Sequence, residues 1–109
     1  MNTIILRRNR EQFVASCVDR LGNRTWSANG QSPGIALCKL FEDHPNLFPF
    51  AIDLIELPGM KVLRVEGLPG RYAGAGSTWG DALLSLLLRH GTALGVFLRI
   101  QNAQQAKHT

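Results

Sequence analysis

Arginines and the aromatic rings near them are the residues best suited to binding chemistry. Three arginines cluster near the N-terminus, and Arg24 and Arg71 lie within two residues of Trp26 and Tyr72. A guanidinium group makes forked hydrogen bonds to phosphate or carboxylate, and an aromatic ring beside it can stack on an unpaired base. The candidate binding residues are Arg7, Arg8, Arg10, Arg24, Trp26, Arg71 and Tyr72.

Residues of the catalytic and metal-binding types do not occur in the required arrangements. Cys17 and Cys38 form no CxxC motif and lie in different expected elements, so we predict that both thiols are buried. His44 and His90 are expected at helix C-termini, where the helix dipole favours an imidazolium. The glycine-rich residues 74–80 lack the Gly-Lys-Ser/Thr ending of a phosphate loop. We therefore predict a protein that is not an enzyme and holds no metal and no cofactor.

Length and composition indicate one folded domain. The chain has 109 residues, of which 45% are hydrophobic and 18% are charged, so it is long enough for one core but not for two. The formal net charge of +4 permits an acidic partner without requiring one. Apolar stretches reach only about seven residues, too few to span a bilayer, and no signal peptide is readable. We expect a cytoplasmic protein that does not contact a membrane.

The domain is predicted to consist of two similar halves, at about 1–46 and 47–100, followed by a short polar tail, 101–109. Three of the matching pairs, aligned with one gap at Asn29, are Val18 with Val65, Gly30 with Gly76, and His44 with His90. The match passes through two types of secondary structure in the same order, which is typical of an internal repeat. Whether the repeat is a true duplication stays open.

Each half is predicted to contain three strands and a helix. The expected strands are residues 3–8, 12–18, 24–28, 50–56, 61–66, 71–75 and 94–100. Ser32 and Thr78 are suited to cap the two helices, with Asp81 completing a capping box, and Gly91 is suited to end the second helix. Short turns make neighbouring strands antiparallel. The fold class is therefore α+β, an antiparallel sheet with two helices, in the order βββα-βββα-β with an internal pseudo-repeat.

The second helix, residues 79–90, is apolar on nearly all of its sides. One sheet face cannot cover that much apolar surface, and the last strand offers a free edge. We therefore predict that part of this surface meets a partner protein or a second copy of the chain, which would make a homodimer. The residues assigned to this surface are Leu84, Leu87, Leu88 and Phe97.

Residues 65–83 contain a Leu-Pro-Gly turn at residues 68–70, a Gly-Ser-Thr bend and cap at residues 76–78, and Asp81 followed by Ala-Leu at the start of a helix. This pattern resembles that of the HicB-type antitoxin family. The resemblance implies a βββα unit that partly resembles a double-stranded-RNA-binding domain. It also implies a protein that inhibits a partner ribonuclease toxin by covering it.

Two functions are consistent with these features. The first is a non-enzymatic protein-binding module that acts as an inhibitor or adaptor, either antitoxin-like or as an anti-defence protein of a phage or mobile element. The alternative is a small RNA- or DNA-binding protein that uses an arginine-rich sheet face. In the first case the partner is another protein, and in the second it is nucleic acid.

Overall fold

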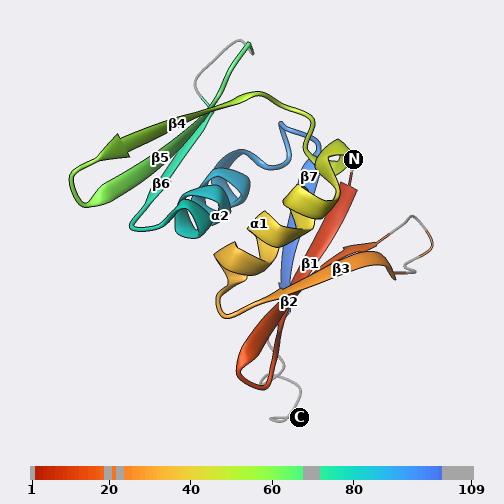
Figure 1. Ribbon diagram of the computed structural model, residues 1–109. Coiled ribbons are helices and arrows are strands. Elements are labelled where there is room, and N and C mark those ends of the chain that lie inside the picture. The colour runs from red at the N-terminus through yellow and green to blue at the C-terminus, as the bar shows by residue number, and fades with distance from the viewer. Residues whose placement is uncertain (1, 19–20, 22–23, 68–71, 102–109) are drawn as a thin grey trace.

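The computed structural model describes residues 2–18, 21, 24–67 and 72–101 (Figure 1). The strands are β1 (Asn2–Asn9), β2 (Gln12–Val18), β3 (Arg24–Gly30), β4 (Ile52–Leu57), β5 (Met60–Val65), β6 (Ala73–Gly76) and β7 (Val96–Gln101). The helices are α1 (Pro33–Asp43) and α2 (Trp79–His90), and a short 3₁₀ helix (Pro45–Leu47) follows α1. The predicted bounds of the second helix are confirmed. Of the predicted tail, Gln101 belongs to β7 and the rest lies outside the described residues.

The strands form two sheets, not one. Sheet A has the strand order β3-β2-β1-β7, and sheet B has the order β4-β5-β6. Every neighbouring pair is antiparallel except β1 and β7, which are parallel. The α+β class is confirmed, while the prediction of a single antiparallel sheet is wrong. Hairpin turns fix the direction of neighbouring strands, but β1 and β7 are joined by almost the whole chain, so no turn sets their relative direction.

The two helices lie between the two sheets (Figure 1). Helix α1 packs on β2 and β3, α2 packs on β5 and β6, and the helices pack against each other. A helix presents one apolar stripe, so each helix covers the small sheet formed by the strands before it. The largest fully buried side chains come from sheet A and from both helices, and they are Ile4, Leu6, Leu37, Leu40, Leu86 and Val96.

The two predicted hydroxyl caps and the end of α2 at Gly91 are confirmed. The Ser32 hydroxyl accepts a hydrogen bond from the Ile35 amide at 3.2 Å, and the Thr78 hydroxyl accepts one from the Asp81 amide at 3.1 Å. Gly91 is the C-terminal cap of α2, although its backbone is right-handed. A Cβ atom there would lie 2.6 Å from the Val96 carbonyl oxygen. Glycine is therefore needed at this position because β7 returns directly against the end of α2.

The two sheets correspond position by position when they are compared across their strands. In each sheet, residues that lie opposite one another on the three neighbouring strands form a row. The first such row begins at the glycine two positions before the N-cap residue of the following helix. These rows are Gly30, Phe13 and Arg8 in sheet A, and Gly76, Lys61 and Glu56 in sheet B. The next rows on the same face are Ala28, Ala15 and Leu6 in sheet A, and Gly74, Leu63 and Leu54 in sheet B. Leu6 in β1 therefore matches Leu54 in β4.

This correspondence corrects the sequence alignment by one residue in the second strand of each half. The alignment paired Val65 with Val18, whereas in the sheets Val65 occupies the place of Cys17. Val65 pairs with Ile52, and Cys17 pairs with Ile4. Side chains alternate between the two faces of a strand, so a shift of one residue exchanges the inner and outer faces. Val65 and Cys17 are both buried on the face that meets the helices.

Candidate partner-binding groove

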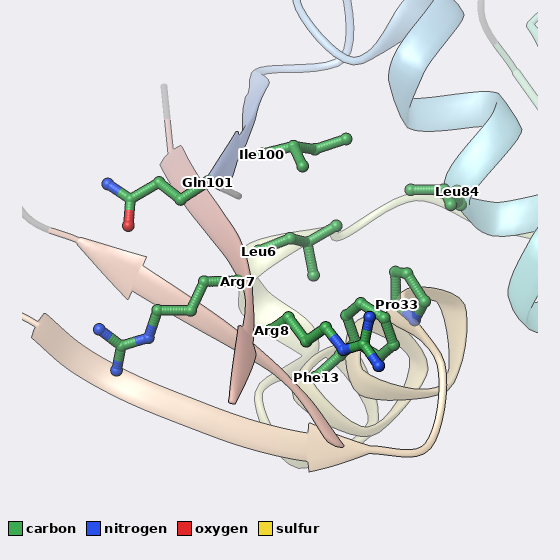
Figure 2. Close-up of a pocket in the computed structure, with 8 residues that line it drawn as sticks. All are labelled: Leu6, Arg7, Arg8, Phe13, Pro33, Leu84, Ile100 and Gln101. Atoms are coloured by element: carbon green, nitrogen blue, oxygen red, sulfur yellow. The ribbon is translucent and has the colours of Figure 1, made fainter. Parts of the chain in front are cut away.

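The predicted arginine cluster is divided between the two faces of sheet A. Figure 2 shows Arg7 on one side of β1 and Arg8 on the other, beside Phe13. The Arg8 guanidinium lies 6.0 Å from the centre of the Phe13 ring, and its Nε donates a hydrogen bond to the Arg10 carbonyl. Arg10 itself lies in the turn, with a left-handed backbone (φ 61°). The three guanidinium groups therefore do not form one binding patch, because alternation along the strand separates them.

The predicted aromatic residues are packed within their own halves. Trp26 stacks on His44 with ring centres 4.5 Å apart, and Tyr72 meets His90 edge-on at 5.2 Å. His44 and His90 do lie at the helix ends, as predicted. The predicted roles of Arg71 and of the Arg24 side chain concern positions outside the part that the structure describes. Trp26 keeps 37% of its surface exposed, with His44 stacked on its ring, and Tyr72 is half-buried.

The predicted partner surface on α2 is wrong for Leu87, which is only 3% exposed. Helix α2 lies between sheet B and α1, so its apolar sides are used inside the molecule. Leu84 is half-buried against the core, whereas Leu88 and Phe97 are exposed. Phe97 lies on the face of sheet A that points away from the helices, because its neighbours Val96 and Leu98 point inward. These leucines and Phe97 therefore do not form one continuous surface.

Two apolar cavities lie at matching places in the two halves. The first, of about 260 Å³, lies between β1, β7 and the two helices (Figure 2). Its lining residues are Leu6, Arg7, Arg8, Phe13, Pro33, Leu84, Ile100 and Gln101. The second, of about 420 Å³, lies between α1, sheet B and the start of α2, and we call it the β4 groove. Its lining residues are Cys38, Phe41, Glu42, Pro45, Phe48, Ile52, Leu54, Leu63, Trp79 and Leu83.

The two cavities differ in what covers the first strand of each half. In sheet A, β7 pairs with the outer edge of β1, and Leu6 is 1% exposed. In sheet B, no strand among the described residues pairs with the outer edge of β4, and Leu54 is 66% exposed. The free edge also presents unpaired backbone amide and carbonyl groups. Matching leucines thus have opposite exposure because only one of them has a covering strand.

One acidic side chain lines the β4 groove, and two others lie on β4 itself. Glu42 lines it, and Glu56 forms an ion pair with Lys61. Asp53 lies on the outer face of β4 and binds Arg64 at 2.6 Å. A hydrogen bond with Asp53 raises the pKa of Glu66, while the same contact, together with Arg64, lowers the pKa of Asp53. The Arg64 guanidinium therefore pairs with Asp53, while Glu66 is influenced mainly through its contact with Asp53.

The two cysteines have different surroundings. Cys17 is buried in the core, as predicted, whereas Cys38 is half-buried and lines the β4 groove. Burial raises the pKa of the Cys38 thiol, and nearby Glu42 raises it further. The thiol is therefore protonated at neutral pH, and its reactivity reports on whether the groove is covered.

The residues of the β4 groove were not selected from the sequence. A signal was present in β4, whose sequence IDLIEL carries apolar residues on both faces. Ile52 and Leu54 point to the helix side, while Ile55 and Leu57 point to the other side. Such a strand is suited to burial on both faces, although it lies at the edge of its sheet.

Within the described residues, no group of three His, Cys, Asp or Glu side chains is placed to hold a metal ion. No helix in the described part of the chain has the length and apolarity needed to cross a membrane. Comparison of the chain with protein-family models, with curated proteins and with solved structures finds no match.

Proposed function

We propose that the protein is a non-enzymatic binding module, an inhibitor or adaptor, that takes up another protein at the β4 groove. The observation that carries this proposal is the exposure of Leu54, at a position where the matching Leu6 is covered by β7. Full burial of a leucine side chain contributes about 1.5–3 kcal/mol. A partner that covers Leu54 and pairs with the edge of β4 gains this apolar term together with backbone hydrogen bonds.

The resemblance to HicB-type antitoxins is consistent with this proposal, because it implies inhibition by covering a partner. For the fold, we further propose that the two βββα halves form an internal repeat, to which β7 is added. The matching rows of the two sheets support it. In this proposal β7 covers the first half, and the partner covers the second.

The function is tested by capture of partners on the tagged full-length chain from its native host. Wild-type protein is compared with Leu54→Glu and with the matched control Leu88→Glu, since both leucines are exposed. A charge in the groove is expected to weaken retention of a stoichiometric partner at least about tenfold, the scale of an interface hot spot. Leu88→Glu is expected to bind like wild type. Equal capture by all three proteins, or no stoichiometric partner at all, would show that the groove is not the binding site.

A second candidate function is RNA or DNA binding by the outer face of sheet A. The four strands of sheet A contain four arginines and no Asp or Glu. Arg7 and Arg99 lie on the face away from the helices, where Phe97 is 46% exposed. A positive sheet face with an exposed ring is suited to a single strand.

This candidate predicts a gel shift that weakens steeply with salt. Replacing Arg7 and Arg99 together by alanine is expected to lower the slope of log K against log salt by about two, because each phosphate contact contributes about one. Arg89→Ala, on the exposed part of α2, is the matched control and leaves the slope unchanged. Absence of a shift with any nucleic acid at low salt refutes this function.

A further inference from the structure

Strand β7 shows how the edge of a first strand is covered in this protein. It runs parallel to β1, with Leu98 beside Ile4, Arg99 beside Ile5, and Ile100 beside Leu6. Leu98 packs against the core and Ile100 lines the first cavity. Arg99 points to the opposite face, because side chains alternate. The covering strand therefore has the pattern apolar, basic, apolar.

The same positions can be identified in β4 from the matching rows. Ile4 and Leu6 correspond to Ile52 and Leu54, which again lie on the helix side. The residue between them, Ile5 in β1, corresponds to Asp53 in β4. In sheet A this outer row is Ser27, Ser16 and Ile5, and in sheet B it is Ala73, Arg64 and Asp53. The position that faces a basic residue of the covering strand is thus acidic in β4.

We propose that β4 binds an extended segment of the partner protein that runs parallel to it and has the pattern apolar, basic, apolar. The two apolar side chains lie beside Ile52 and Leu54 and fill the β4 groove, and the basic side chain lies beside Asp53. This inference rests on the proposed function and specifies the segment that the partner contributes.

Charge supports a basic segment as the occupant of this edge. Arg64 pairs with Asp53, and the Glu66 amide bonds to the Ala51 carbonyl, so Asp53, Arg64 and Glu66 together carry one formal negative charge at the beginning of β4. Glu42 adds a further carboxylate on the groove side. A second copy of β4 would bring two more acidic residues and no basic one, since its sequence is IDLIEL. A basic segment from another protein therefore complements the edge better than a second copy of this strand does.

The volume of the groove agrees with this occupant. The first cavity, already lined by β7, measures about 260 Å³, whereas the β4 groove measures about 420 Å³. The larger cavity is thus the one whose first strand has no covering strand among the described residues. Apolar side chains of an added strand would enter this space and reach Cys38 on α1.

The test uses the intact chain and a synthetic peptide with the sequence of β7, which carries the proposed pattern. A nitroxide at the peptide N-terminus is expected to broaden the amide signals of residues 51–53 of the protein, because the strands run in the same direction. Alkylation of Cys38, measured at about pH 9, where part of the thiol is ionised, is expected to slow at least about fivefold when the peptide covers the groove. Cys17, buried in the core, serves as the internal control.

A charge exchange tests the role of Asp53. A peptide in which glutamate replaces the arginine is expected to bind wild-type protein about tenfold more weakly, and Asp53→Arg is expected to restore its binding. Because the Asp53–Arg64 pair is exposed, Asp53→Arg leaves the fold intact, which circular dichroism verifies. Leu54→Glu is expected to abolish peptide binding, and Leu88→Glu to leave it unchanged.

Several outcomes overturn the inference while leaving the proposed function standing. Broadening at residues 56–57 shows an antiparallel segment, and broadening at residues 2–4 shows displacement of β7 from β1. Equal binding of both peptides to wild-type protein removes the role of Asp53. Light scattering that shows a dimer broken by Leu54→Glu identifies a second copy as the occupant, which overturns the proposed function as well. If Leu54→Glu changes partner capture but no peptide binds, the segment pattern is wrong. If Leu54→Glu changes neither, the proposed function also fails.

Discussion

Replacement of Gly34 by valine is expected to destabilise the protein by about 3 kcal/mol or more, the upper range for overpacking a closely packed contact. Gly34 lies in the first turn of α1, where the two helices meet. A Cβ atom added there would lie 2.3 Å from the carbonyl carbon and oxygen of Gly80 in α2. Both are backbone atoms that cannot rotate away, so the helices must separate and the groove beside α1 must widen.

The measurement is the free energy of unfolding from denaturant titration of the full chain. Gly34→Ala is expected to lose less than Gly34→Val, because it adds less volume. Lys39→Val, which places the same side chain at an exposed position of α1, is the matched control and is expected to change stability by less than about 1 kcal/mol. Equal stability of Gly34→Val and wild type would mean that the helices do not cross at these glycines.

Two adjacent leucines of α2 are expected to respond very differently to truncation. Leu87→Ala should cost about 2–4 kcal/mol, since it removes a side chain from the core and leaves a cavity. Leu88→Ala should cost less than about 0.5 kcal/mol, because Leu88 is mainly surrounded by water. The sequence pattern assigned both residues to the same partner surface.

This pair is its own matched control, because the two substitutions remove the same atoms from the same helix. Denaturant titration of both variants separates burial from helix propensity, which is nearly equal at the two positions. Similar losses for both variants would contradict the placement of α2 between sheet B and α1.

Signals that act within a few residues were sufficient for the secondary structure. Ser32 and Thr78 cap their helices as predicted, because a cap requires only a hydroxyl and an amide three residues later. The bounds of α2 and of β2 follow from periodicity and turns alone. The second bond predicted for the capping box is not the one formed, because the Asp81 carboxylate accepts a hydrogen bond from the Ser77 hydroxyl at 3.2 Å instead.

The candidate binding residues were less predictable. Closeness in sequence suggested that Arg7 and Arg8 act together, yet neighbouring residues of a strand point to opposite faces. This could have been concluded from the predicted strand itself. The apolar character of α2 suggested an external surface, but it reflects burial between a sheet and a second helix, which depends on where α1 lies.

The sequence by itself determined the α+β class, the helices with their caps, and most strand positions, because these depend on contacts between nearby residues. Only the tertiary structure decided that the strands form two sheets, that β7 pairs with β1 in parallel, and that β4 has a free edge. These features depend on pairing between segments far apart in the chain. The hydrophobic periodicity and composition of a strand do not specify which strand it pairs with, in which register or in which direction. The exposure of Leu54 and the burial of Leu6 follow from that pairing, although both are leucines in similar strands.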